Sequence, residues 1–507
     1  MLMDDAQRPV VLVELRPALD GYAGIPQETR LLFSGLTGTQ EFTVQGLLQT
    51  SIQYLPEAIP AEPHQLVHHE KINRCSKLVI ALSSGRKKFK VMRFLQRKWL
   101  PFWLLLTNNI LIKFNTLDVS MFKSNGFEDF IWARLFSKSL HANEFKNVTK
   151  ATFLVLRMPW NAMNLSGIWS RMLTGRAKYP NLNITNVQLF ISQTPYPANL
   201  STSTKLVIRY HDAVPIYLPH TISNMAMHQA GHYLALRDNV ASGAYFACVS
   251  EASRASLLSI FPEMSSRAVC IENMVSHHYF LEEKNSTYVK NIIEARNTNV
   301  NSVSKRHSVI IDLQADIEWP ADTDYILMVS TLEPRKNHLT LLEAFENLRI
   351  RHGLKTKLVL VGSKGWSAED ILDKIVPGMR SGYIFWLSGV PSDELRVLYR
   401  NSILTVCPSI AEGFDYSGVE AMCSGGVVLA SDIAVHREIY ADAAEYFNTY
   451  DALELESKLH FLLSKDEASL ARIQDLKIKG VQHYQKFRPD QIMPKWRTFL
   501  ESIIATE

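Results

Sequence analysis

The chain has 507 residues, of which 47% are hydrophobic and 21% are charged. This length predicts about two to four domains rather than one small module, and the composition is that of a globular protein, not of a disordered chain. The formal net charge of +4 is too small for a nucleic-acid-binding protein of this size, so no nucleic-acid partner is predicted.

Cysteine spacing and apolar runs indicate the compartment. The five cysteines are widely scattered without a CxxC pair, which predicts neither a disulfide framework nor a zinc site. The first apolar run is short and follows two acids, unlike a secretory signal. The most apolar stretch, Trp99–Ile112, is interrupted by Pro101 and is shorter than the roughly 20 residues that a spanning helix needs. We therefore predict a cytoplasmic protein without a transmembrane helix.

In the first half of the chain, short apolar runs predict the strands of one α/β domain. These runs are VVLVEL (10–15), KLVIALS (77–83), ATFLVL (151–156), KLVIRY (205–210) and AYFACVS (244–250). Gly24 lies in a loop after the first run, where a glycine lets the backbone approach a ligand, although the GxGxxG fingerprint is absent. His211 ends the fourth run, where it can either contact a sugar or serve the structure alone.

A basic and aromatic stretch, RKKFKVMRFLQRKWLPFW (86–103), lies between the second and third of these runs. Cations interleaved with aromatic residues are expected of an interfacial anchor on anionic lipid, but a solvated helix face has the same pattern. The residues of this candidate membrane patch are Lys87, Lys88, Lys90, Arg93, Arg97, Lys98 and Trp99.

Residues 285–324 are rich in Asn, Ser and Thr and have weak periodicity, which predicts a linker. The predicted organisation is an N-terminal domain (1–284), this linker, a C-terminal domain (325–477) and a helical segment (478–507) that can pack back on the N-terminal domain. The triplet Asp322-Thr323-Asp324 resembles a DxD metal motif, but its place before a strand favours a turn. No metal site is predicted.

The second half has more regular strand signals, nearly continuous in apolar residues as strands buried on both faces must be. They are YILMVS (325–330), KLVLVG (357–362), IFWLSG (384–389), LTVCPS (404–409) and GVVLAS (426–431). Helical patterns fill the gaps between them. Strands that alternate with helices predict a doubly wound parallel sheet, which binds ligands at the carboxyl ends of its strands.

Two segments at such strand ends carry candidate chemistry. Between the fourth strand and the next helix, backbone N–H groups at Ser417 and Gly418 can bind an anion such as a diphosphate. Glu412 is placed to bind ligand hydroxyls, whereas Glu420 can equally form a capping box with Ser417. After the first strand of this half, Arg335 and Lys336 can neutralise a diphosphate, or form a solvated pair.

The blocks LEPRKNHLTLLEAF, LVLVGSKGW, SGVPSDELRVLYRNS and PSIAEGFDYSGVEAMCSGGVVLASD, in this order, resemble the donor half of the family 4 (group 1) retaining glycosyltransferases. HDAVPIYLP, CVSEASRASLL and GIPQETRLL extend the resemblance over most of the chain. It implies the GT-B fold, in which two Rossmann-like α/β domains face a cleft. Members transfer a sugar with retention and are thought to use front-face displacement, so no nucleophile is assigned. They usually need no metal, so no cofactor is expected.

The resemblance also implies roles for individual residues. Glu412 lies beside the transferred sugar and His211 near its 6-hydroxyl, and these two are the candidate catalytic residues. The candidate donor-binding residues are Gly24, Arg335, Lys336, Gly413, Phe414, Ser417, Gly418 and Glu420. Among them Arg335 and Lys336 hold the diphosphate and Glu420 binds the ribose. Ser250 matches a recurrent serine whose role stays open.

One departure from the family pattern concerns the donor. Members most often read Glu-Gly-Phe-Gly-Leu-Pro, whereas this chain has Asp415, Tyr416 and Ser417 in the last three places. The implied function is transfer of a hexose, with mannose as the first candidate, from a nucleotide sugar to a glycan or polyprenyl-linked acceptor in surface polysaccharide (O-antigen or capsule) synthesis, at the inner face of the membrane. The alternatives are a GT-B sugar phosphorylase or synthase and a catalytically inactive, membrane-bound partner of a glycan synthesis complex.

Overall fold

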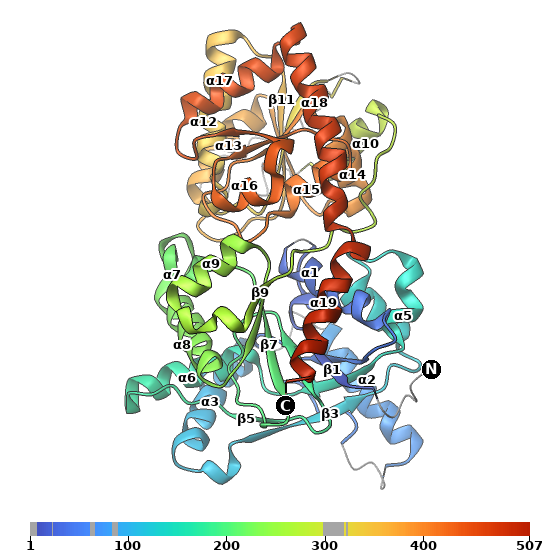
Figure 1. Ribbon diagram of the computed structural model, residues 1–507, viewed down its shortest axis with the longest axis vertical. Helices are drawn as coiled ribbons and strands as arrows, with labels where there is room; N and C mark the ends of the chain where they lie inside the picture. Colours follow the sequence, from blue (N-terminus) through green and yellow to red (C-terminus); the bar gives the residue numbers. More distant parts are fainter. Residues whose placement is uncertain are drawn as a thin grey trace.

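The structure is a computed structural model that describes residues 8–22, 24–60, 66–83, 90–297, 319–320 and 323–506, with only the backbone for 90–97. One mostly parallel sheet and one fully parallel sheet, each flanked by helices, form two domains stacked along the long axis of the molecule (Figure 1). The predicted pair of α/β domains is therefore confirmed. All five cysteines are free.

The N-terminal sheet has, within the described residues, nine strands in the order β5-β3-β4-β2-β1-β6-β7-β8-β9. All pairs are parallel except β3 with β4. The strands are β1 (Val10–Glu14), β2 (Thr43–Leu48), β3 (Thr116–Phe122), β4 (Thr152–Leu156), β5 (Asn181–Asn183), β6 (Leu189–Ser192), β7 (Lys205–Tyr210), β8 (Tyr245–Cys248) and β9 (Ala268–Cys270).

Helices cover both faces of this sheet. The longer ones are α1 (Ile25–Thr37), α2 (His68–Ser83), α3 (Lys90–Asn109), α6 (Trp160–Thr174), α8 (Met225–Ala241) and α9 (Glu251–Ile260). Short helices are η2 (Pro17–Leu19), η3 (Ile112–Phe114), α4 (Glu128–Ile131), η4 (Trp132–Phe136), η5 (Ala142–Glu144), α5 (Phe145–Thr149), α7 (Val214–Tyr217), η6 (Pro219–Thr221) and η7 (Pro262–Ser266).

One predicted strand of this domain is wrong. KLVIALS (77–83) is the last part of helix α2. Its buried residues, Cys75, Leu78 and Leu82, recur three and four positions apart, which is the period of a helix face. A short apolar run does not by itself distinguish a buried strand from a buried helix face, and here the helix begins upstream at His68.

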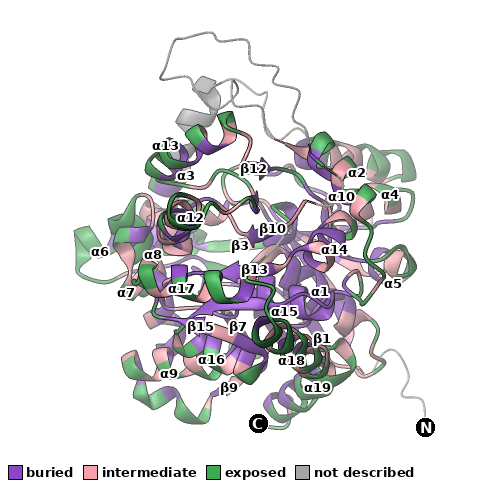
Figure 2. Cartoon of the chain, turned by 90° about the horizontal axis from the view of Figure 1, so that it is seen from above, coloured by how far each residue is buried: buried purple, intermediate pink, exposed green. Residues whose placement is uncertain are grey.

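The C-terminal sheet has the order β12-β11-β10-β13-β14-β15, and all its pairs are parallel. The strands are β10 (Tyr325–Val329), β11 (Lys357–Val361), β12 (Ile384–Leu387), β13 (Leu404–Cys407), β14 (Val428–Ser431) and β15 (Ala444–Phe447). The helices are η8 (Pro334–Lys336), α12 (His338–His352), α13 (Glu369–Arg380), α14 (Ser392–Asn401), α15 (Tyr416–Cys423), α16 (Ala434–Tyr440), η9 (Ala441–Ala443), α17 (Ala452–Leu463) and α18 (Glu467–His483). The first five strands were predicted. In Figure 2 the strands are mostly buried and the exposed residues lie on the outer helices.

The structure corrects the predicted domain boundaries. Met274 belongs to an N-terminal core, whereas Val275 and Tyr279 already belong to a C-terminal core, so the chain crosses earlier than predicted. The first part of the predicted linker is helix α10 (Ser286–Arg296), which packs on α14. Arg296 forms a two-hydrogen-bond ion pair with Glu394 there, at 2.7 Å for each bond.

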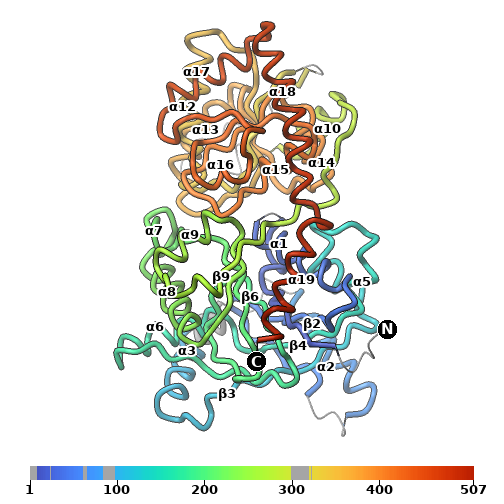
Figure 3. Tube along the Cα trace, in the orientation of Figure 1, coloured from blue at the N-terminus to red at the C-terminus, as the bar shows by residue number. Residues whose placement is uncertain are grey.

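The C-terminal segment returns to the N-terminal domain, as the sequence allowed. The predicted boundary at 477/478 lies inside α18, which stays on the C-terminal domain. After η10 (Tyr484–Phe487), helix α19 (Pro489–Ile504) runs down beside α1 (Figure 3). Its buried side chains, including Trp496 and Leu500, complete the N-terminal core.

Candidate active site between the two domains

Loops at the carboxyl ends of strands from both domains meet between the two sheets. The C-terminal domain contributes the loops after β10 and β13, and the N-terminal domain those after β1, β7 and β8. A Cβ atom added to Gly413 would lie 2.0 Å from the carbonyl oxygen of His211, so the two loops are in direct contact. Trp366 Nε1 also donates across the interface to the carbonyl of Thr221 at 2.7 Å. The predicted residues are thus brought together from opposite ends of the sequence.

Glu412 lies between the two predicted cations. Arg335 Nη1 donates to Glu412 Oε2 at 2.9 Å, and Lys336 forms an ion pair with Oε1 of the same carboxylate. Burial alone would raise the pKa of Glu412, but the charges of Lys336 and Arg335 outweigh burial and hold this pKa below its ordinary value. Arg335 also pairs with the buried Glu333, at 2.8 Å from Nε. This corner of the site therefore contains charged groups at neutral pH.

The backbone of His211 contacts the Gly413 loop from the N-terminal domain. Its Nε2 atom lies 3.3 Å from Gln193 Oε1, and the ring is only partly exposed. Burial lowers the pKa of His211 to about 3, so the ring is neutral at physiological pH. A neutral imidazole can donate a hydrogen bond to a ligand hydroxyl or accept one from it, but it adds no charge.

The role of Ser250, which the sequence left open, is structural. Its hydroxyl accepts a hydrogen bond from the backbone N–H of Ser253 at 3.0 Å and so caps helix α9. The same hydroxyl donates to the carbonyl of Gly413 at 2.7 Å. Ser253 Oγ donates to the carbonyl of His211 at 2.9 Å. Ser250 therefore fixes the position of the Gly413 loop against the N-terminal domain.

Asp415 shapes the start of α15. Its φ of 64° is in the left-handed region, which Asp tolerates better than most residues. Its carboxylate accepts hydrogen bonds from the backbone N–H and the hydroxyl of Ser417 at 3.2 and 2.6 Å, and lies 3.1 Å from His436 Nε2. Burial would raise the pKa of Asp415, but the hydrogen bond to His436 and the charge of Lys336 hold it well below its ordinary value.

These contacts differ from the prediction that free backbone N–H groups at Ser417 and Gly418 bind a diphosphate. The backbone N–H of Ser417, expected to be free for an anion, donates to Asp415, and the helix begins at Tyr416 with Asp415 as its N-cap. Packing requires a residue without a side chain at Gly418, because a Cβ atom there would lie 2.3 Å from the Tyr440 ring. Phe414 is buried, with its ring centroid 5.2 Å from that of Phe487.

Glu420 is buried and is not part of a capping box. Its two carboxylate oxygens accept hydrogen bonds from Gln27 Nε2 at 3.0 Å and from the Tyr399 hydroxyl at 3.1 Å. Both partners are neutral, and burial raises the pKa of Glu420 to about 7. Gln27 lies in the first turn of α1. A side chain of the N-terminal domain is therefore hydrogen-bonded to the carboxylate that, by the family resemblance, would bind the ribose. Gly24, with φ 70°, begins this helix.

A second buried contact joins the same two helices. The Tyr416 hydroxyl donates to Glu28 Oε2 at 3.0 Å, and Arg209 Nε donates to Glu28 Oε1 at 2.9 Å. The side chains of Glu28 and Arg209 are fully buried, and Arg209 also donates to Asn273 at 2.7 Å. Tyr416, one of the departures from the family pattern, is therefore an interdomain contact. We call Gln27–Glu420 and Tyr416–Glu28–Arg209 the interdomain clamp.

Few features of the sequence indicate the clamp. Gln27 and Glu28 stand in the first turn of a helix, where polar residues usually face solvent, and their partners lie several hundred residues away. His436 lies too far along the chain from Asp415 for a local sequence pattern to connect the two residues. The only available indication was that Asp415 and Tyr416 depart from the family pattern.

The candidate membrane patch is only partly described. Lys87 and Lys88 lie outside the described residues, as does Asp322 of the DxD-like triplet. Lys90, Arg93 and Arg97 lie on α3, whose side chains are described only from Lys98 onward; Lys98 and Trp99 are exposed. In the part of α3 and the other helices that the structure describes, none is long and apolar enough to cross a membrane.

Comparison with known proteins agrees with the geometry. The profile of the family described as glycosyl transferases group 1 matches residues 310–477, which include Arg335, Lys336, Glu412 and Glu420. O-antigen chain mannosyltransferase B of Escherichia coli is 35% identical over 119 residues, which are 24% of this chain and 31% of that protein. O-antigen chain mannosyltransferase RfbU of Salmonella typhimurium is 29% identical over 136 residues, 27% of this chain and 37% of that one. The chain thus spans about a third of the length of each of these two relatives.

Solved structures extend the likeness to both domains. Sucrose-phosphate synthase from Thermosynechococcus elongatus aligns with a TM-score of 0.55 at 14% identity, covering 99% of this chain and 100% of that one. The Anabaena protein HepE in complex with UDP and glucose aligns with a TM-score of 0.54 at 12% identity, covering 98% and 100%. At these identities the likeness concerns the fold alone. Residues 310–477 are therefore similar to the glycosyl transferases group 1 family, and the whole chain has the two-domain GT-B fold.

Proposed function

We propose that the protein is a retaining glycosyltransferase that moves a hexose from a nucleotide diphosphate sugar to a glycan or lipid-linked acceptor in surface polysaccharide synthesis. The observation that carries this proposal is the Glu412 carboxylate held between Arg335 and Lys336 in the loop after β13, which contacts the backbone of His211. Mannose is the first candidate sugar, because the two relatives named above are called O-antigen chain mannosyltransferases.

Each group has a task in this reaction. Arg335 and Lys336 stabilise the diphosphate as negative charge develops on it when the bond to the sugar breaks. Glu412 positions those cations and faces the sugar, and neutral His211 binds a sugar hydroxyl. Glu420 accepts hydrogen bonds from the ribose hydroxyls. No metal is needed in this scheme, because the two side-chain cations supply the positive charge.

Two alternatives use the same fold. A sugar phosphorylase or a synthase would be distinguished from a transferase by its products. The test is whether phosphate or a nucleotide is released with the product. An inactive, membrane-bound partner of a glycan synthesis complex has no need for the charged pair at Glu412, and an intact pair therefore favours an enzyme.

Nucleotide binding tests the proposal. Calorimetry of the full chain with GDP, UDP, ADP and dTDP and their common sugars is expected to select one nucleotide. Glu420→Gln is expected to weaken that binding by about tenfold or more, because a hydrogen bond to a charged group is lost. Glu456→Gln is the matched control, since Glu456 is a buried glutamate of the same domain on α17. Failure of every nucleotide to bind the folded protein would favour the inactive partner.

A further inference from the structure

Helices α3 and α6 and the short helix η3 expose many large apolar side chains. Ile110 is 72% exposed and Met172 is 77% exposed. The exposed set on these elements and their ends is Trp99, Phe102, Trp103, Ile110, Leu111, Ile112, Phe114, Met172 and Leu173. Soluble proteins rarely expose so many neighbouring apolar side chains unless the surface binds something.

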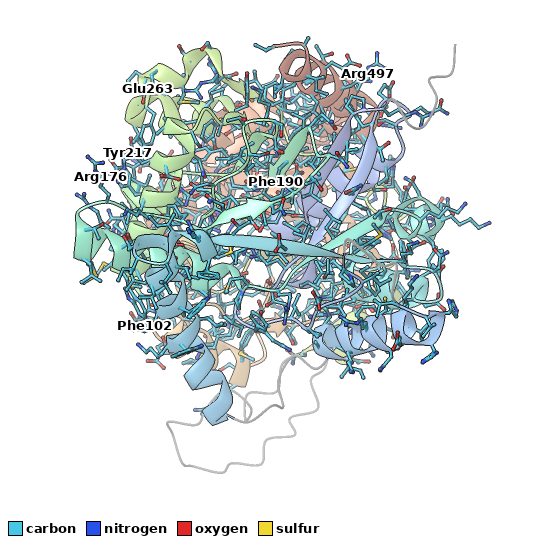
Figure 4. All side chains as sticks on the ribbon, turned by 90° about the horizontal axis from the view of Figure 1, so that it is seen from below. Phe102, Arg176, Phe190, Tyr217, Glu263 and Arg497 are labelled. Atoms are coloured by element: carbon cyan, nitrogen blue, oxygen red, sulfur yellow. The ribbon has the colours of Figure 1, made fainter. Side chains whose placement is uncertain are left out.

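Hydrogen bonds hold these elements together as one surface. Asn108 Nδ2, near the end of α3, donates to the carbonyl of Lys178 at 3.0 Å, just beyond the end of α6. The Ser170 hydroxyl of α6 lies 3.3 Å from Asn109 Oδ1 and 3.0 Å from the carbonyl of Arg176. Figure 4 shows Phe102 of α3 and Arg176 beyond α6 on the same outer side of the N-terminal domain. We call this the α3–α6 surface.

The segments that form the α3–α6 surface carry cations and no acid, although Asp118 just after η3 is exposed and Asp238 of the neighbouring helix α8 is partly exposed. The sequence contains no Asp or Glu from Lys71 to Leu117, and none from Phe145 to His211. Both stretches contribute exposed cations to the surface, namely Lys98, Lys113, Arg171, Arg176 and Lys178. The candidate membrane patch belongs to the first stretch, but α6 and η3 add cations and apolar groups that its sequence pattern did not include.

We propose that the α3–α6 surface docks on an anionic lipid bilayer. Its aromatic and aliphatic side chains would enter the headgroup region while the surrounding cations contact lipid phosphates, the arrangement expected of an interfacial protein element. The excess of cations over acids on this surface favours an anionic partner. Exposed Trp99 and Trp103 fit the bilayer interface, where amphipathic rings are favoured. This inference does not rest on the proposed reaction, because binding is measured without turnover.

Sedimentation with vesicles tests the inference on the full chain. The protein is expected to bind vesicles of phosphatidylcholine with phosphatidylglycerol and to bind pure phosphatidylcholine vesicles far less. A charge variant (Lys98→Gln, Lys113→Gln, Arg171→Gln and Arg176→Gln) and an apolar variant (Ile110→Ser, Ile112→Ser and Phe114→Ser) are each expected to lower the partition coefficient by about tenfold or more. All seven positions are exposed or partly exposed, so folding is expected to persist.

The matched control lies on the C-terminal domain. Ile350→Ser with Lys355→Gln and Lys374→Gln removes an 80% exposed isoleucine and two exposed cations, and is expected to leave vesicle binding unchanged. Brominated lipid is expected to quench tryptophan fluorescence less when Trp99 and Trp103 are replaced by Phe. Equal vesicle binding by wild type and both variants would overturn the inference. Binding to a single-stranded oligonucleotide, or self-association through this surface, in place of vesicle binding would also overturn it.

Discussion

Two buried glutamates of the site have opposite surroundings. Glu412 lies against two cations, which keep its pKa below the ordinary value and the carboxylate charged. Glu420 lies against the neutral groups of Gln27 and Tyr399, and burial raises its pKa to about 7. Neighbouring acids with such different environments are suited to different tasks. Glu412 is held in its charged form, whereas Glu420 gains or loses a proton near neutral pH.

Nucleotide binding is therefore expected to depend on pH through Glu420. Ribose hydroxyls donate to a carboxylate, so they favour the charged form and lower its pKa. Binding is expected to release a proton near pH 7 and to weaken as pH falls below about 7. Calorimetry in buffers of different ionisation enthalpy measures this proton. Its persistence in Glu420→Gln would assign the proton to another group.

The raised pKa of Glu420 also predicts how the free energy of unfolding changes with pH. The folded pKa of about 7 exceeds the ordinary value of 4.5, so the folded state binds more protons between these values. The contribution of Glu420 to stability is present below pH 4.5 and is lost as pH rises through 7. Urea unfolding of wild type and Glu420→Gln between pH 5 and 8 measures it, and the difference between the two is expected to change in this window.

Loss of the charged pair at Glu412 is expected to affect turnover most. Glu412→Gln and Lys336→Ala are each expected to lower kcat/KM by about a hundredfold or more, the usual cost of one electrostatic contact to a transition state. Radiolabelled sugar transfer measures this. Glu456→Gln and Lys374→Ala, away from the site, are the controls and are expected to stay within about twofold. Turnover of the site variants near the wild-type rate would show that the assignment is wrong.

At the scale of secondary-structure elements, prediction in the C-terminal domain was best where burial is complete. Strands β10 to β14 are buried on both faces and appear as continuous apolar runs. Strands β2 (TVQGLL) and β15 (AEYF) contain polar residues or glycine, so neither apolar continuity nor alternation indicated them. Candidate site residues that follow predicted strands could be named from the sequence because the strands themselves were recognised. The clamp could not be named, because its partners meet only when the two domains fold against each other.

The close contact between the Gly413 loop and the His211 loop can be tested by mutation. In Gly413→Ala, the new methyl group would overlap the carbonyl oxygen of His211, and the domains must move apart to admit it. Turnover is expected to fall by about a hundredfold, since small displacements of reacting groups have such effects. Steady-state kinetics and small-angle scattering measure the rate and the domain separation.

Gly21→Ala is the matched control, because a Cβ atom there lies 3.6 Å from its nearest neighbour, Pro26, an ordinary contact distance. Its kinetics and scattering are expected to match the wild type. Unchanged turnover in Gly413→Ala would mean that the two loops separate during the reaction anyway.

At the scale of the whole molecule, the part of the chain that the structure describes crosses between the domains twice. The first crossing follows Met274, and the second leads into α19, which completes the core of the other domain. Trp496 of α19 is fully buried, and the Arg209 guanidinium lies 5.1 Å from its ring centroid. Arg209 belongs to the interdomain clamp, so the last helix supports both the N-terminal core and the interface.

Trp496→Ala is accordingly expected to destabilise the N-terminal domain by about 3–5 kcal/mol, the usual cost of removing a large buried aromatic. Hydrogen exchange is expected to accelerate in β1 and α1 and to stay nearly unchanged in β10 and β11. Ile478→Ala, at a residue 49% exposed on α18, is the control, with a change within about 0.5 kcal/mol. Equal acceleration in both domains would show that the two cores unfold as one unit.

The contacts of Glu420 and Glu412 have a consequence for how tightly any donor binds. Each group assigned to the donor already has a protein partner: Gln27 and Tyr399 on one carboxylate, and Glu412 on both cations. In the proposed reaction, donor binding would be an exchange of partners, and its free energy would be the difference between two sets of bonds. Gln27 would compete with the released nucleotide for Glu420 and so favour its departure.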